Sequence, residues 1–159
     1  MTTPFDTPTQ PLAVLDTNVI LDALVFGNPT VTLLVQALKA HQLVAIGTPR
    51  MVKELADVLI YKMSKRTHLD HQDLLSQWQA LMQERTAPEP LGPGTRPICT
   101  DATDQMFIDL AVSARAQFLI TRDRALLKTA KRCAKLGFTV CTPEGWLGLH
   151  VHLKAGRID

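Results

Sequence analysis

Apolar residues along the chain form short unbroken runs, separated by longer segments in which they recur with helical periodicity. The short runs predict strands, because a strand buried on both faces needs no alternation of apolar and polar positions. They cover residues 12–15, 43–48, 118–121 and 138–142. The longer segments predict helices, which cover residues 29–41, 49–63, 69–85, 103–115, 124–135 and 143–149, with a further helix-like stretch directly after residue 15.

This order of elements predicts an α/β fold, because short apolar strands that alternate with helices pack as a parallel sheet covered by helices on both faces. A length of 159 residues fits one domain. We place it at residues 12–150, between an N-terminal tail of residues 1–11 and a C-terminal tail of residues 151–159. The Pro- and Gly-rich segment 87–97 is expected to be a loop within the domain.

Composition favours a soluble globular protein, with 46% hydrophobic and 20% charged residues and a net charge of +2. No apolar run approaches the ~20 residues of a membrane span, so a membrane is not an expected partner. The N-terminus lacks the basic start and apolar core of a signal peptide. Cys99, Cys133 and Cys141 have no C-x-x-C spacing. We therefore expect buried free thiols in a reducing cytoplasm rather than disulfides or zinc ligands.

Four carboxylates lie at comparable places in this pattern. Asp16 and Asp123 each follow a predicted strand. Asp104 precedes the apolar stripe of its helix at spacings that direct its side chain along the buried face. Glu54 lies at the edge of the apolar arc of helix 49–63. Each acid has a simple explanation on its own: Asp16 and Asp123 as helix caps, Asp101 and Asp104 as a capping-box-like pair, and Glu54 as an exposed helix residue.

In combination these acids predict a metal site, because ligands of parallel sheets bind beyond the carboxyl ends of the strands. Carboxylates packed together repel one another and lose hydration, and a hard divalent cation relieves both effects. Carboxylate and water oxygens suit Mg²⁺ or Mn²⁺, whereas zinc prefers nitrogen and sulfur. Such a cation lowers the pKa of a bound water and neutralises charge on a phosphate. The chemistry indicated is phosphodiester hydrolysis.

Other motifs point less clearly to chemistry. His68 and His71, and likewise His150 and His152, form pairs without a third ligand, and zinc sites ordinarily need three or four. The sequence has no P-loop, dinucleotide-binding or nucleophile-elbow motif. A strand-end Asp also occurs in haloacid dehalogenase-like phosphatases, but that family has a second Asp two residues on, where this chain has Asn18.

Four segments of the chain resemble the PIN-domain nucleases in order and register. They are "AVLDTNVILDAL", "TPRMVKELADVL", "CTDATDQMFIDLAV" and "FLITRD". The resemblance runs from about Leu12 to Leu149 and is greatest to the branch that supplies the toxin components of toxin–antitoxin pairs. It implies a three-layer α/β/α sandwich around a central parallel sheet of about five strands, and a Mg²⁺- or Mn²⁺-dependent ribonuclease.

The resemblance also assigns roles to residues. The positions of the acidic quartet, catalytic and metal-binding in the family, are taken by Asp16, Glu54, Asp104 and Asp123. Asn18 matches a polar residue that braces the first Asp, Thr121 matches the Thr of a T-x-D segment, and Asp101 is a candidate auxiliary acid. Thr103 and Gln105 are neutral where relatives often have acids, so one metal ion is expected more readily than two.

Basic residues near these acids are the expected RNA contacts, with Arg122 and Arg124 as the best candidates because they flank Asp123. The full set is Arg122, Arg124, Lys128, Lys131 and Lys62, with Lys65 and Arg66 beside the last. The alternative for the basic residues of segment 122–135 is that they form a solvent-exposed helix face without a ligand. The expected partners are an RNA substrate, an antitoxin protein and a second copy of the chain. The alternative function is a PIN-fold module that binds RNA or protein without cutting.

Overall fold

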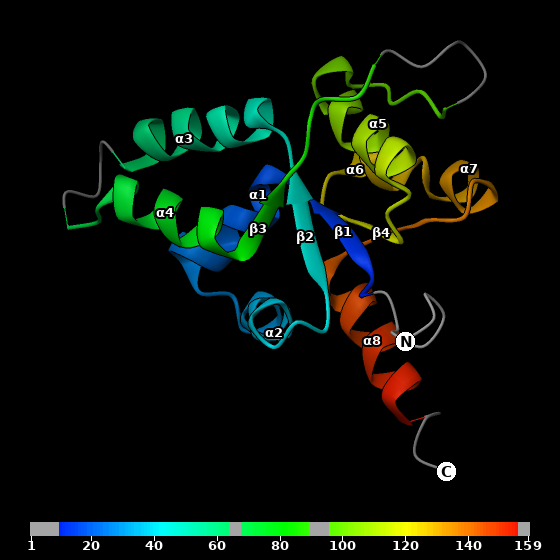
Figure 1. Ribbon diagram of the computed structural model, residues 1–159, viewed down its shortest axis with the longest axis horizontal. Helices are drawn as coiled ribbons and strands as arrows, with labels where there is room; N and C mark the ends of the chain where they lie inside the picture. The colour runs from blue at the N-terminus through cyan, green and yellow to red at the C-terminus, as the bar shows by residue number, and fades with distance from the viewer. Residues whose placement is uncertain (1–9, 64–67, 90–95, 156–159) are drawn as a thin grey trace, which may run out of the picture.

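A parallel sheet forms the centre of the molecule. The computed structural model describes residues 10–63, 68–89 and 96–155. Within these residues five strands pair in parallel in the order β3-β2-β1-β4-β5 (Figure 1). The strands are β1 (Leu12–Leu15), β2 (Val44–Gly47), β3 (Met82–Glu84), β4 (Phe118–Ile120) and β5 (Thr139–Cys141). The predicted α/β class with about five parallel strands is confirmed, and β1 lies at the centre of the sheet.

Helices connect each strand to the next. They are α1 (Thr17–Leu21), the π-helical turn η1 (Asp22–Phe26), α2 (Pro29–Lys39), α3 (Pro49–Met63), α4 (His71–Leu81), the 3₁₀ turn η2 (Ala102–Asp104), α5 (Gln105–Ala114), α6 (Arg124–Leu127), α7 (Ala130–Lys135) and α8 (Pro143–Ala155). As predicted, Pro29 begins a helix, and the Asn28 side chain caps it by accepting hydrogen bonds from two backbone amides.

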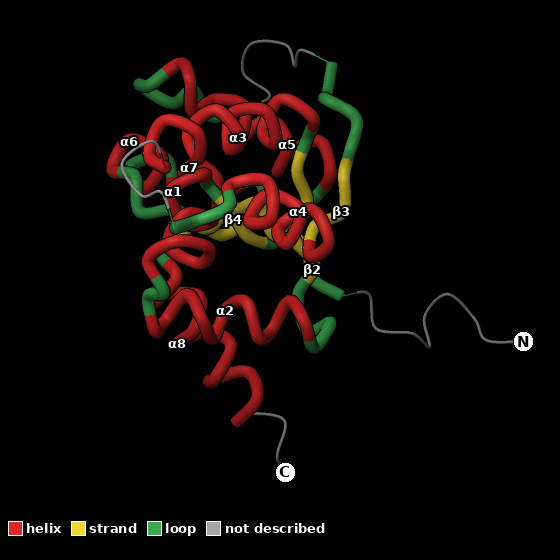
Figure 2. The backbone as a smooth tube through the Cα atoms, turned by 90° about the vertical axis from the view of Figure 1, so that its left-hand side faces the viewer, coloured by secondary structure: helices red, strands yellow, loops and turns green. Residues whose placement is uncertain are grey.

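Two apolar clusters cover the two faces of the sheet. Alternate residues of β1 point to opposite faces, so that Ala13 and Leu15 belong to one cluster and Val14 to the other. The first cluster joins β1 to α1, α2, α4 and α8, and Figure 2 shows α2 and α8 packed together on one side of the strands. The second joins it to α5 and α7. The result is the expected three-layer arrangement.

The prediction of one helix over residues 69–85 is wrong at the C-terminal end of that segment. The helix α4 stops at Leu81, and Met82–Glu84 form β3 instead. Met82 pairs with Ala45 of β2, and the Arg85 amide donates to the Gly47 carbonyl at 2.7 Å. The hydrogen-bonding groups on that edge of β2 need partners, and this requirement prevails over the helical periodicity of the segment.

The basic segment predicted as one helix over residues 124–135 is two helices, α6 and α7. The helix is interrupted at Thr129, a buried residue whose hydroxyl donates to the Leu126 carbonyl at 2.6 Å. In contrast, α8 is longer than predicted and continues to Ala155. The proposed N-terminal tail lies almost wholly outside the described residues, as do residues 156–159 and most of the loop 87–97.

Among the described residues no single helix is long and apolar enough to cross a membrane, and one bent pair, residues 17–26 with 29–39, meets that test by length and composition alone. Cys99 and Cys133 are buried free thiols, as predicted, and Cys141 is a half-buried one.

Candidate active site

The carboxyl ends of β1, β2 and β4 lead into the segments that carry Asp16, Glu54 and Asp123, and the η2 turn brings Asp104 close enough for its pKa to be raised by Asp16 and Asp123. Asp16 directly follows β1, and Asp123 comes three residues after the end of β4. Glu54 lies in the second turn of α3, the helix that follows β2, and Asp104 ends the η2 turn before α5. Because β1 stands between β2 and β4, Asp16 lies between the other acids.

Asp16 is a buried carboxylate held by a buried threonine. The two side chains are 4% and 0% exposed, and the Thr121 hydroxyl donates to Asp16 Oδ2 at 2.8 Å. The same hydroxyl accepts the Asp123 amide hydrogen at 2.9 Å. Burial raises the pKa of Asp16, against the effect of the Thr121 hydroxyl and the Asn18 backbone amide, and the charges of Asp123 and Glu54 raise it further.

Helix capping is only a weak constraint on Asp16. It occupies the N-cap position of α1, but its side chain makes no hydrogen bond of capping geometry. Asn18, the predicted brace, is exposed and acts on Asp16 through its backbone N–H, while the Thr121 hydroxyl is the side-chain donor to Asp16. Asp123, in contrast, does cap its helix, because its Oδ1 accepts from the Ala125 amide at 2.7 Å.

Asp104 is the most perturbed acid of the group. Its Oδ2 is buried and has no hydrogen-bond partner. Burial, followed by the negative charges of Asp123, Asp101 and Asp16, raises the pKa of Asp104 to about 7. Asp101 is exposed and is satisfied by Thr103, whose backbone amide and hydroxyl donate to its Oδ1 at 3.0 and 2.6 Å and lower the pKa of Asp101.

Glu54 is oriented by a residue that the sequence analysis missed. The hydroxyl of Thr17, which is 8% exposed, donates to Glu54 Oε2 at 2.8 Å. Thr17 adjoins Asp16, and Glu54 is close enough to raise the pKa of Asp16 by charge repulsion. The middle residue of the D-T-N start therefore connects two of the acids, a role that neither its helical position nor its polarity indicated.

These acids fit a hard divalent cation in chemistry, although no ready ligand set is formed. Among the residues that the structure describes, no group of three or more His, Cys, Asp or Glu side chains is placed to hold a metal ion as it stands. The site nevertheless has a buried oxygen without a partner on Asp104, and the pKa values of two carboxyls are raised, that of the buried Asp16 and that of the half-buried Asp104. A cation that coordinates oxygen would give the Asp104 oxygen a partner and would lower the raised pKa values of the two carboxyls.

Comparison with known families agrees with this fold. A family model described as PIN domain matches residues 13–125. The chain belongs to the PIN-domain family. PIN domains are generally nucleases, and the match spans all four acids.

A solved structure resembles this PIN domain in fold. It is the crystal structure of VapBC2 from Rickettsia felis bound to a DNA fragment from their promoter. The two chains are 14% identical, with a TM-score of 0.54, and the match covers 81% of this chain and 96% of the other. At that identity the likeness shows the fold alone. A search of curated proteins finds no match.

Arg122, a predicted RNA contact, has two carboxylate partners within the protein. Its guanidinium donates to Glu144 at 2.8 and 2.9 Å and to Asp22 at 3.2 Å. These bonds tie the end of β4 to η1 and to the first turn of α8. The Arg122 side chain is 33% exposed, and the pKa of Glu144 is lowered by it. Arg122 thus fastens the site's framework to the rest of the PIN domain.

The other predicted RNA contacts are placed differently. Arg124 on α6, Lys128 in the turn after it and Lys131 on α7 are all exposed. Arg124 directly follows Asp123, so it is the exposed base next to the acids in sequence. The side chain of Lys62 lies outside the described residues, and so do Lys65 and Arg66.

Gln105 stands where relatives often have an acid, and its side chain binds the segment 96–99 that precedes the site. Its Oε1 accepts the Cys99 amide hydrogen at 2.7 Å, and its Nε2 donates to the Pro97 carbonyl and to Asp109 at 3.0 Å each. Asp109 also pairs with Arg96. The neutral residue at this position of the PIN domain therefore fixes residues 96–99 against α5.

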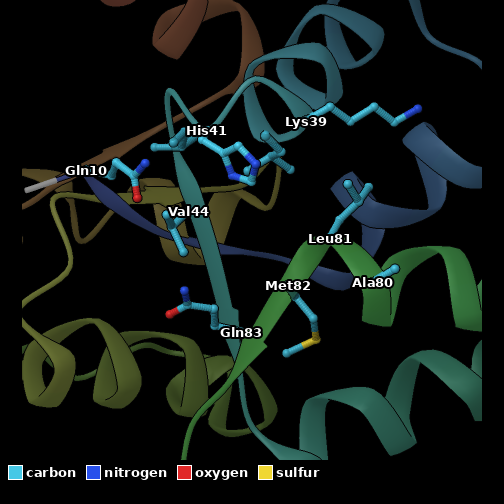
Figure 3. Close-up of a pocket in the computed structure, with 10 residues that line it drawn as sticks. Gln10, Lys39, His41, Val44, Ala80, Leu81, Met82 and Gln83 are labelled. Atoms are coloured by element: carbon cyan, nitrogen blue, oxygen red, sulfur yellow. The ribbon is translucent and has the colours of Figure 1, made fainter.

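A separate cavity lies at the amino-terminal end of the sheet, away from the acids. It has a volume of about 350 Å³ and is lined by residues before β1, at the end of α2 and at the starts of β2 and β3 (Figure 3). His41 and Lys39 on its wall are exposed, and none of the described residues that line it is a carboxylate. It therefore supplies no acid to the candidate site.

Replacing Thr121 tests its support of Asp16. Thr121→Val is expected to cost about 1–3 kcal/mol of unfolding free energy, because a buried acceptor loses its donor. Since the hydroxyl stabilises the charged form of Asp16, this cost should be larger at pH 8 than at pH 5 in urea denaturation with a chelator present. Thr121→Ser keeps the hydroxyl and should cost about 1 kcal/mol at both pH values, for the lost methyl. A Val penalty independent of pH would contradict the assignment.

The raised pKa of Asp104 predicts that stability falls as pH rises. A carboxyl whose pKa is higher in the folded state binds more protons there than in the unfolded chain, so its contribution is fully present below its ordinary pKa and is lost through about 7. With chelator present, the melting temperature should decrease between pH 5 and pH 8. The decrease should be smaller in Asp104→Asn, whose amide does not titrate. If calorimetry gives the same decrease in melting temperature for the wild type and Asp104→Asn, Asp104 does not titrate as a buried carboxyl.

Proposed function

We propose that this PIN domain is a Mg²⁺- or Mn²⁺-dependent endoribonuclease. The observation that carries the proposal is the state of Asp16 and Asp104. Burial raises the pKa of both carboxyls, each also feels the charges of neighbouring acids, and one oxygen of Asp104 has no partner. A buried carboxylate without compensation is unfavourable. A divalent cation on these oxygens supplies that compensation.

Asp16, Asp104 and Asp123 would hold the cation, with Glu54 on the opposite side of Asp16. These ligands offer oxygen alone, which suits Mg²⁺ and Mn²⁺. When bound, such a cation lowers the pKa of a water and neutralises charge that develops on a phosphate. Because Asp123 also caps α6 through Oδ1, its position is fixed by the helix that it begins.

The residues of the chain itself position the reaction. Thr121 fixes the orientation of Asp16, and Thr17 that of Glu54. Glu54 is thereby suited to orient the attacking water and to accept its proton. The water oxygen bonds to phosphorus, and one phosphorus–oxygen ester bond breaks, which leaves a phosphomonoester end and a hydroxyl end. Arg124, Lys128 and Lys131, all exposed, would bind the RNA backbone.

The competing function is a PIN module that binds RNA without cutting it. It is favoured by one observation, that the described acids form no ready ligand set. Titration with Mn²⁺ in a calorimeter, together with a cleavage assay on single-stranded RNA, separates the two functions. Saturable Mn²⁺ binding with cleavage supports the nuclease, whereas RNA binding without turnover supports the module.

The substitution Asp16→Asn tests the nuclease directly. It should reduce metal-dependent cleavage by at least about 100-fold, since even residues that support metal ligands contribute 10- to 100-fold. The metal-free protein should stay folded and be no less stable, because a buried amide costs less than a buried carboxylate. Asp73→Asn, an exposed acid on α4, is the matched control and should cleave normally. Cleavage by Asp16→Asn at the wild-type rate would exclude this site.

We further propose an antitoxin as the partner and toxicity as the outcome of cleavage. The sequence resembles the toxin branch of the PIN family, and the fold resembles VapBC2, which was solved on a DNA fragment from their promoter. A small neighbouring open reading frame should encode a protein that co-purifies with this chain as a stable complex and suppresses its cleavage of RNA. Expression of the chain alone should arrest growth. Undiminished growth with active enzyme would reject the toxin role while leaving the nuclease intact.

A further inference from the structure

We propose that a cavity between α3 and the start of α5 binds the nucleotide next to the scissile phosphate of single-stranded RNA, with Arg50 as its phosphate contact. The inference rests on the proposed ribonuclease function and adds a substrate subsite to it. The cavity has a volume of about 260 Å³. Its lining residues are Arg50, Lys53, Glu54, Asp57, Thr103 and Met106.

The cavity adjoins the acids directly. Glu54 belongs to both, since it lines the cavity and is held by Thr17 beside Asp16. On the opposite wall, Thr103 lines the cavity and donates to Asp101, whose charge acts on Asp104. A chain segment whose phosphate reached the acids would therefore place its neighbouring nucleotide in this cavity.

Arg50 is the wall residue best suited to a phosphate. It is exposed in the first turn of α3, and among the described residues no carboxylate pairs with it. Lys53, by contrast, pairs with Asp57 at 3.1 Å. The first turn of this 15-residue helix contains no acidic residue, so the positive end of the helix dipole adds to the charge of Arg50. A guanidinium binds phosphate oxygens in a fixed, two-pronged geometry.

Two further wall residues, Met106 and Thr103, suit an unstacked base. Met106 offers a polarizable thioether, which packs well against aromatic rings, and Thr103 offers a hydroxyl. Bases of a double helix are stacked in its interior, whereas single-stranded RNA exposes them to side chains. The combination of a cation, a soft apolar surface and a hydroxyl therefore favours a single strand over a duplex.

The order of the β-strands suggests a path for the RNA across the carboxyl end of the sheet. α3 follows β2 and α6 follows β4, and β1 stands between these two strands (Figure 1). Arg50 and Arg124 lie in the first turns of these helices, so they flank the end of β1 from its two sides. Adjacent strands of a sheet are about 4.8 Å apart, a spacing that a short oligonucleotide easily crosses. The RNA would cross the edge of the sheet from the β2 side to the β4 side, with its scissile phosphate over Asp16.

Binding of a labelled eight-nucleotide single-stranded RNA in EDTA tests this subsite without cleavage. The logarithm of the binding constant is measured against the logarithm of salt concentration by fluorescence anisotropy. Arg50→Gln should reduce the magnitude of the slope by about 0.7, the value for one phosphate contact on a single strand. Lys39→Gln removes an equally exposed charge at the other end of the sheet and should leave the slope unchanged. An RNA duplex should show no dependence on Arg50.

Parallel cleavage assays in Mn²⁺ keep the two proposals distinguishable. A wild-type protein that cleaves RNA, together with equal salt slopes for wild type and Arg50→Gln, would overturn the subsite and keep the nuclease. A slope that depends on Arg50 in a protein that does not cleave would keep the RNA site and overturn the nuclease. Absence of RNA binding by the wild type even at low salt would overturn the subsite, and absence of cleavage in Mn²⁺ as well would overturn both proposals.

Discussion

The burial of a carboxylate at the centre of a parallel sheet is the constraint on which the rest of the site depends. Asp16 leaves β1, the middle strand, in a region where water is largely excluded. Its charge is opposed there by desolvation and by neighbouring acids on three elements. A fold tolerates such a position only if something compensates the charge, by protonation or by a bound cation. Both outcomes follow from the order of strands, because that order brings the acids together.

Neutral residues do the positioning in this site, and Arg122 does not. Thr121 and Thr17 donate hydrogen bonds to Asp16 and Glu54. These hydroxyls orient the acids without neutralising them. Arg122, next to Thr121 in sequence, is instead held by Asp22 and Glu144. A cationic side chain among the acids would form an ion pair and remove the requirement for a metal. The arrangement therefore keeps the negative charge of the site available.

Much of the fold was predictable because it follows from local pattern, and the rest depends on contacts distant in sequence. Buried strands such as 12–15 were identified by their unbroken apolar runs, and the acids by their places after strands. Met82 was assigned to a helix because its spacing fits one, whereas pairing with Ala45 of β2 makes it a strand residue. The roles of Thr17 and Arg122 were missed for the same reason. Their partners are 37 and 22 or more residues away, and no periodicity records such a bond.

The amide of Gln105 limits how this site can change. An amide both accepts and donates, and Gln105 uses both abilities, toward the Cys99 amide on one side and toward Pro97 and Asp109 on the other. A carboxylate at this position could keep the accepted bond but would lose both donated ones and would face Asp109 as a like charge. An acid at position 105 for a second cation would therefore require new contacts that hold the segment 96–99. Negative charge at this position can be gained only through coupled substitutions.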